Sequence, residues 1–303
     1  EIVSRDWSSD VCSSDLGEPP EFPRFAPFER FQGLVEVDSY LRECNYWQNV
    51  ENSLDMSHVG YVHGDNRAAF DGIGLGRRLT ATESDWGVTY TFERPDGRRR
   101  IQQWGMPNVF YMTALPTGVD WQESLFWWVP IDDTRHMQFS LHRVPVQGQE
   151  AEAFKSRREA QRTSIDLAHQ DVCDQILGGM LKLSQVDRTR VDLVRLQDDI
   201  AQVGQGVFAS ENPERLGKAD IGVAMIRRVM KRELATMAEG RPLKQWQRTP
   251  HIVPRVWALA EEGEKPLATV EGDVEAEVID IRPHVEVALQ RQALHGVERK
   301  RSQ

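Results

Sequence analysis

The sequence predicts an α+β protein, and three observations carry that prediction. Residues 41–63 have the pattern of a helix that breaks near its end. Residues 77–146 contain short alternating segments bounded by Pro, Gly and Asp, which is typical of a meandering antiparallel sheet. Residues 147–177 and 221–240 have helical patterns again. Because helices and strands are segregated along the chain, we expect a curved antiparallel sheet with helices packed into its concave side.

The expected strands follow from alternation and from turn residues. Residues 87–92, which read G-V-T-Y-T-F, alternate and are followed by the turn Pro95-Asp96-Gly97. Further strands are expected at 101–104, 109–115, 124–129 and 136–142. Beyond the sheet, residues 182–204 have a mixed pattern. The helix at 221–240 is expected to close at Gly240, in the C-cap position, and the tail at 285–303 to form a polar amphipathic helix.

The two ends of the chain differ from its middle. Residues 1–16 include the low-complexity repeat S-S-D-V-C-S-S-D and are interpreted as a non-native segment that resembles translated sequencing adapter. Residues 17–45 begin rich in Pro and Phe and are predicted to be an extended connector. The main domain is expected at 46–250, followed by a C-terminal extension with a polar helix at 251–303. On this interpretation, a domain that preceded the connector is missing.

Composition argues against several classes of function. The net charge is −10, whereas proteins that bind phosphate backbones need clustered Lys and Arg, so nucleic acid is not an expected partner. No apolar run approaches the roughly 20 residues of a membrane span, and no secretory signal is evident. The three cysteines are Cys12, Cys44 and Cys173. Their wide separation argues against a disulfide framework and favours a reducing, cytoplasmic location.

The most informative segment is 51–63, which reads E-N-S-L-D-M-S-H-V-G-Y-V-H. It holds Asp55, His58 and His63 in a D-x2-H-x4-H arrangement, and neutral imidazoles bind iron, zinc and copper. On an ideal helix Asp55 and His58 are about 60° apart, but His58 and His63 are about 140° apart. Both histidines can reach one metal only if the helix ends or bulges between them, and residues 59–62 favour such a break.

A third ligand from elsewhere would complete the site. One carboxylate with two histidines forms a face that leaves coordination positions open for other ligands. Two later Gln-Asp pairs offer that carboxylate, namely Gln170-Asp171 and Gln197-Asp198. Each has a glycine eight residues beyond its aspartate, at Gly179 and Gly206, so the local residues alone do not choose between them.

Three blocks of the chain resemble one known family. Residues 45–63 read N-Y-W-Q-N-V-E-N-S-L-D-M-S-H-V-G-Y-V-H and resemble the mononuclear-iron segment of Rieske non-haem iron oxygenases. The match is to the branch of phthalate dioxygenase and the aromatic O-demethylases, which has N-W-x-Q, E, D-x-S-H and H in this order. Residues 197–228, with Q-D, G, E-R-L-G-x-x-D and R-R, and residues 128–134 (W-V-P-I-D-D-T) resemble the same branch. The resemblance covers roughly residues 17–246.

The resemblance implies a site and a fold. Only Asp198 is followed by E-R-L-G-x-x-D, so the resemblance favours Asp198 as the third ligand beside His58 and His63, with Asp171 and Asp199 as alternatives. Asp55 would not bind iron but would hydrogen-bond a ligating histidine and bridge toward the Rieske cluster of a neighbouring subunit; otherwise it caps a helix. The expected fold is the helix-grip fold of Bet v1-like and START-like domains, in which a curved antiparallel sheet wraps around helices.

The resemblance also implies an activity and its partners. The expected enzyme activates O2 at a mononuclear Fe(II) to dihydroxylate or O-demethylate a small aromatic, carboxylated substrate. Its [2Fe–2S] Rieske cluster would belong to the full-length parent and not to this chain, because the chain has no C-x-H with a later C-x2-H. Electrons would come from a ferredoxin or an NAD(P)H-dependent reductase, and the expected assembly is a cytoplasmic homotrimer.

Other interpretations stay open at this stage. A second interpretation is a domain that binds a small ligand without catalysis and carries no stoichiometric iron. A third is a hydrolase in which the same three ligands hold zinc, with a general base beside the metal-bound water. His142 lies in an alternating strand and is a weak candidate for a substrate carboxylate. The tryptophans are more often core residues than pocket walls; they are Trp47, Trp104, Trp127 and Trp128.

Overall fold

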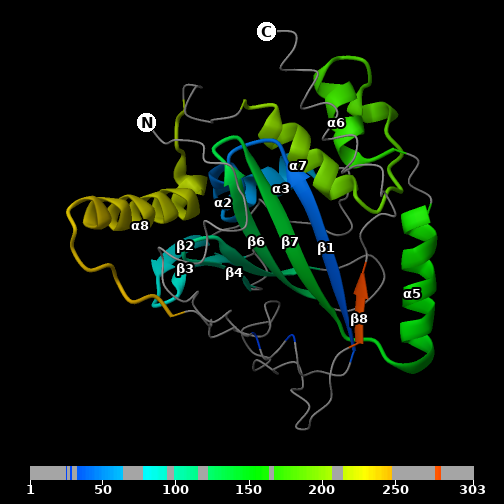
Figure 1. Cartoon of the computed structure of the whole chain (residues 1–303), viewed down its shortest axis with the longest axis horizontal. Coiled ribbons are helices and arrows are strands. Elements are labelled where there is room, and N and C mark those ends of the chain that lie inside the picture. Colours follow the sequence, from blue (N-terminus) through cyan, green and yellow to red (C-terminus); the bar gives the residue numbers. More distant parts are fainter. Residues whose placement is uncertain are drawn as a thin grey trace, which may run out of the picture.

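The structure is a computed structural model with one large sheet and helices packed against it (Figure 1). It describes residues 33–63, 78–93, 99–114, 122–163, 167–206, 214–247 and 277–280, together with Phe25 and Phe28. Within these residues the predicted α+β class is confirmed. The predicted segment 1–16 and the predicted tail helix at 285–303 lie outside the described residues.

The sheet has the strand order β2-β3-β4-β5-β6-β7-β1-β8. Neighbours from β2 to β1 are antiparallel, and β8 alone pairs in parallel, with β1. The predicted meander at 77–146 is therefore confirmed, because β2 to β7 follow one another in sequence and in space. The strands are β1 (Leu34–Arg42), β2 (Arg78–Glu83), β3 (Gly87–Glu93), β4 (Arg99–Gly105), β5 (Val109–Ala114), β6 (Gln122–Asp132), β7 (Arg135–Val144) and β8 (Glu277–Asp280).

The helices also follow the predicted pattern after the sheet. The described ones are α2 (Tyr46–Ser53), α3 (Met56–Val62), α5 (Gly148–Thr163), α6 (His169–Leu177), α7 (Leu193–Val203) and α8 (Ile221–Ala238), with short 3-10 turns at Leu183–Gln185 and Lys218–Asp220. Helix α8 ends close to the predicted position, since Gly240 follows it with a positive φ of 66° that favours glycine. None of the helices in the described part of the chain has both the length and the hydropathy needed to cross a membrane.

Strand β1 is the main feature that the sequence pattern did not indicate. It lies within the predicted connector at 17–45, yet it pairs with β7 along its whole length, from Leu34 opposite Val144 to Arg42 opposite His136. Its alternation is obscured because it buries charged side chains, which normally point to solvent. Each buried charge has an opposite partner on α5 or α7: Glu36 with Arg158, Asp38 with Arg195, and Arg42 with Asp199.

The predicted helix at 41–63 is divided into two, and the division lies earlier than expected. Helix α2 ends at Ser53, and the side chain of Asp55 caps a new helix by accepting a hydrogen bond from the backbone N–H of Ser57 at 2.8 Å. The expected end near the second histidine is also present, because α3 stops at Val62 and His63 is its C-cap. The first break therefore lies at a residue that caps a helix. His63 lies outside the helical part of α3.

The main hydrophobic core lies between the sheet and helices α2, α3 and α8 (Figure 1). We call this side of the sheet the helix-covered face. Trp104 is fully buried there, and Trp47 and Trp128 pack in the same cluster, as expected for core aromatic residues. Helix α8 comes so close to the turn between α2 and α3 that a Cβ atom on Gly222 would lie 2.5 Å from the carbonyl oxygen of Leu54. Glycine at this position therefore permits the contact.

A buried polar cluster around Arg42 joins β1 to α2 and α7. The Arg42 guanidinium donates to the carboxylate of Asp199, to Asn49, to Gln202 at 3.1 Å and to the Tyr40 hydroxyl at 2.8 Å. Arg42 and Asp199 are 2% exposed each, so neither charge is solvated by bulk water. A buried ion that loses its partner is strongly destabilising, which makes this pair a constraint on where α7 can sit.

We expect Asp199→Asn to lower the free energy of unfolding by about 3–5 kcal/mol, because it leaves the Arg42 charge buried without a counter-charge. Urea unfolding of the metal-free protein measures this loss. The matched control is Asp174→Asn on α6, since that aspartate is exposed, and its expected change is within about 0.5 kcal/mol. Equal effects of the two substitutions would contradict the assignment.

A second expectation concerns His136, which is fully buried beside the same cluster. Its Nδ1 donates to the carbonyl of Cys44 at 2.8 Å and its Nε2 lies 3.1 Å from the Asn49 amide, so the ring is neutral. Burial lowers the pKa of His136 to about 4, against about 6.5 for an unfolded histidine. Between these pH values the unfolded chain holds a proton that the folded chain does not.

The free energy of unfolding should therefore fall as the pH decreases from about 6.5 toward 4, by about 1.4 kcal/mol for each pKa unit that separates the two states. Unfolding curves at several pH values, for the wild type and for His136→Gln, isolate this contribution. The variant should have a shallower slope whatever its absolute stability, and identical slopes would show that His136 does not titrate in this way.

Candidate metal centre

Three side chains from distant parts of the chain meet at one end of the sheet, near α2, α3 and α7. His58 lies within α3, His63 directly follows it, and Asp198 lies on α7. The Nε2 atoms of His58 and His63 are 3.8 Å and 3.3 Å from Oδ1 of Asp198, and the three ligand atoms all lie within 4.8 Å of one another. Among the residues that the structure describes, no other three His, Cys, Asp or Glu side chains gather in this way.

The hydrogen bonds of the two imidazoles leave their Nε2 atoms available. Nδ1 of His58 donates to the backbone carbonyl of Asp55 at 2.5 Å. Nδ1 of His63 donates to the side-chain carbonyl of Gln197 at 2.9 Å. When Nδ1 carries the only proton, Nε2 offers a lone pair that can bind a metal ion. Both Nε2 atoms lie on the side of Asp198, and that of His63 hydrogen-bonds it in this structure.

The charges at the site suit a divalent cation. Burial raises the pKa of Asp198, but the hydrogen bond and positive potential from His63, with a smaller contribution from His58, outweigh it, so the net pKa is lowered and the carboxylate is ionised. Burial lowers the pKa of His58. Burial also lowers the pKa of His63, but the hydrogen bond to Asp198 more than offsets this, so the net pKa is raised. Asn52 donates to Oδ1 of Asp198 at 3.4 Å.

The structure separates the three candidate carboxylates. Asp198 lies with the two histidines. Asp199, the next residue on α7, turns the other way and binds Arg42, with a second oxygen 3.1 Å from Nε2 of His169. Asp171 lies in the first turn of α6 and is not part of the gathered set. Of the three, Asp198 is therefore the one whose carboxylate lies with the two imidazoles.

Asp55 contributes to the site in two ways. Its side chain caps α3, which is the structural role considered in the sequence analysis, and its backbone carbonyl orients His58. Its Oδ2 atom also lies 3.8 Å from Nδ1 of His58, and the side chain is 28% exposed. The carboxylate is therefore partly open to solvent, while its charge remains close to a histidine of the site.

Two neighbours of the site were not singled out from the sequence. Gln197 was noticed only as half of a Gln-Asp pair, and Asn52 had no distinguishing pattern. Their contacts depend on how α7 packs beside α2 and α3, which no local pattern reports. Glu51, by contrast, has a structural role, because it accepts two hydrogen bonds from Arg227 on α8 and one from Trp47 at 2.6 Å.

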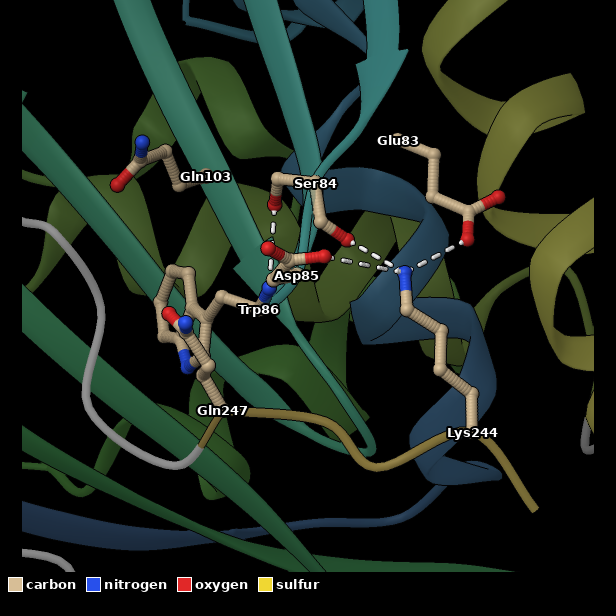
Figure 2. Close-up of a pocket in the computed structure, with 7 residues that line it drawn as sticks. All are labelled: Glu83, Ser84, Asp85, Trp86, Gln103, Lys244 and Gln247. Carbon is tan, nitrogen blue, oxygen red and sulfur yellow. Dashed lines mark hydrogen bonds and ion pairs between the residues drawn. The ribbon is translucent and has the colours of Figure 1, made fainter. Parts of the chain in front are cut away.

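A separate polar cavity of about 490 Å³ opens beside the hairpin between β2 and β3 (Figure 2). Its lining residues are Glu83, Ser84, Asp85, Trp86, Gln103, Lys244 and Gln247. The Lys244 ammonium, which points into this group in Figure 2, donates to Glu83 and to the Ser84 carbonyl at 3.0 Å each. Its charge is thereby balanced within the wall, and none of the three gathered side chains lines this cavity.

Comparison with known proteins supports the resemblance. The family model described as the vanillate O-demethylase oxygenase C-terminal domain matches residues 42–108, which include both histidines. The 5,5'-dehydrodivanillate O-demethylase oxygenase subunit of Sphingobium sp. (strain NBRC 103272 / SYK-6) is 27% identical over 241 residues, 77% of this chain and 51% of that protein. The chain is similar to oxygenase subunits of this kind. The resemblance found in the sequence is therefore confirmed.

Two further relatives have names that specify reactions other than O-demethylation. The tert-butanol monooxygenase / tert-amyl alcohol desaturase oxygenase subunit of Aquincola tertiaricarbonis is 25% identical over 252 residues, 74% of this chain and 50% of that protein. The phenoxybenzoate dioxygenase subunit alpha of Ectopseudomonas oleovorans is 26% identical over 222 residues, 69% of this chain and 48% of that protein. The chain thus spans about half the length of the curated relatives it matches.

Proposed function

We propose that this chain is the catalytic domain of a Rieske-type oxygenase in which His58, His63 and Asp198 hold one ferrous ion. The observation that carries the proposal is the convergence of two imidazole Nε2 atoms and one carboxylate oxygen within 4.8 Å. Two histidines and one carboxylate form the facial triad of non-haem iron oxygenases, which leaves positions open for oxygen and substrate. Ferrous iron bound there would supply the activation of O2 for cis-dihydroxylation of an aromatic ring or for hydroxylation of a methoxy carbon.

The residues around the triad are suited to hold an aromatic substrate. The helix-covered face carries Phe110, Phe126 and Trp128, whose rings contact one another and exclude water. Ser124 lies two residues before Phe126 and therefore on the same face, and its hydroxyl hydrogen-bonds Nδ1 of His142 at 2.8 Å. Burial lowers the pKa of His142 to about 4, so the ring is neutral. We propose this polar pair as the contact for a substrate carboxylate, which fits the aromatic acids in two relatives' names.

Asp55 is proposed as the link to the electron donor. Its carboxylate is partly exposed and lies beside His58. It can therefore contact an approaching protein while it also acts on the basicity of that histidine. We further propose that the full-length protein carries a [2Fe–2S] Rieske cluster, assembles as a cytoplasmic homotrimer and receives electrons from a ferredoxin or an NAD(P)H-dependent reductase. All three relatives are named as subunits, which supports the part of this proposal in which the protein works with partner proteins.

Anaerobic reconstitution with Fe(II) tests the triad. The wild type should bind about one iron per chain, and Asp198→Ala and His63→Ala should each weaken iron binding more than about tenfold, because each removes a ligand. Iron is measured by metal analysis after gel filtration. The matched control is Asp171→Ala, which removes the aspartate of the other Gln-Asp pair and should leave the iron content unchanged.

Three outcomes would contradict the proposal in different ways. Unchanged iron in Asp198→Ala would remove that residue from the ligand set. A wild type without stoichiometric iron would indicate a ligand-binding domain that is not catalytic. Stoichiometric zinc together with hydrolytic activity that needs neither O2 nor a reductant would indicate a zinc hydrolase.

A further inference from the structure

We infer that Gln197 is a positioning residue of the proposed metal site, where its side-chain carbonyl fixes the tautomer and the orientation of His63. This inference rests on the proposed function, because it concerns the same site. Gln197 itself does not face the metal position; it contacts His63, which does.

The contact between the two side chains is buried on both sides. Gln197 is 3% exposed and His63 is 2% exposed, and Oε1 of Gln197 lies 2.9 Å from Nδ1 of His63. A buried imidazole N–H that lacks an acceptor is costly, so the partner available to Nδ1 decides which nitrogen keeps the proton. With a carbonyl oxygen there, Nδ1 can keep its proton when a metal ion takes the lone pair of Nε2, which in this structure hydrogen-bonds Asp198 at 3.3 Å.

His63 needs such a partner more than His58 does. His58 lies inside α3, and its Nδ1 is held by a backbone carbonyl of the same segment, that of Asp55. His63 follows the last residue of α3, and its side chain is turned toward α7. The ring orientation of His63 therefore depends on a residue 134 positions away in sequence.

Helix α7 combines this task with two others in consecutive residues. Successive side chains on an α-helix point about 100° apart. Gln197 accordingly reaches His63, Asp198 faces the two Nε2 atoms, and Asp199 binds Arg42. A single helix thus supplies one ligand, orients a second, and is itself held by a buried ion pair.

The test uses Co(II) as the probe, because its visible spectrum reports the ligand field. Gln197→Leu keeps the size of the side chain but has no acceptor, whereas Gln197→Glu keeps acceptor oxygens. The matched control is Gln205→Leu, the same change at an exposed position just beyond α7. Each variant is titrated anaerobically with Co(II), and both the affinity and the visible spectrum are recorded.

The expected results separate orientation from packing. Gln197→Leu should weaken Co(II) binding by about 10–100-fold, as loss of an outer hydrogen-bond partner typically does, and should change the visible spectrum. Gln197→Glu should bind Co(II) within a few fold of the wild type, with a shifted visible spectrum. Gln205→Leu should match the wild type in all respects.

Two results would overturn the inference. One is a Gln197→Leu variant with the wild-type Co(II) affinity and visible spectrum. The other is a Gln197→Glu variant that binds as weakly as the leucine variant, since that would show that packing and not the acceptor matters. If Asp198→Ala abolishes Co(II) binding while Gln197→Leu does not change it, only this inference fails; if neither changes it, the proposed function fails as well.

Discussion

The buried pair of Arg42 and Asp199 is the interaction on which the arrangement of the site depends. It joins β1, which lies between β7 and the edge strand β8, to α7, the helix that carries Asp198 and Gln197. Two charges removed from water are tolerated only when they meet in good geometry with further hydrogen bonds, and Arg42 donates such bonds to Asn49, Gln202 and Tyr40. A displacement of α7 would therefore disturb this cluster together with the three gathered side chains.

The candidate site is assembled from a local part and a distant part. Residues 55–63 bring both imidazoles close together because α3 starts at a cap formed by Asp55 and stops just before His63. The carboxylate comes from α7, which is fixed by tertiary packing and by the Arg42 cluster. Each part has its own hydrogen-bonded support, namely the Asp55 carbonyl for His58 and Gln197 for His63. This support leaves two nitrogen atoms and one oxygen atom facing one point.

Much of this architecture could be predicted because it is local. The strands β2 to β7 are consecutive neighbours, so alternation and turn residues are enough to predict a meander. Strand β1 could not be predicted in this way, because Glu36, Asp38 and Arg42 are buried in ion pairs whose partners lie far along the chain. The break after Ser53 was expected later, since the sequence does not show whether Asp55 caps a new helix or lies within a continuous one.

The candidate ligands show the same limit. The spacing of His58 and His63 is visible in the sequence, but the choice among Asp171, Asp198 and Asp199 required a family resemblance, because a third ligand from another helix has no fixed spacing. The role of Gln197 depends on which way one turn of α7 faces, which the residues around it do not reveal.

The place of β1 in the sheet also has a consequence for how the protein folds. Leu34 pairs with Val144, more than a hundred positions later, so β1 is synthesised well before its partner strand β7. Such long-range pairing slows folding, because the entropy of closing a long loop is lost before the strands can pair. Until then the charges of Glu36, Asp38 and Arg42 stay in water, where they discourage this strand from pairing with another chain.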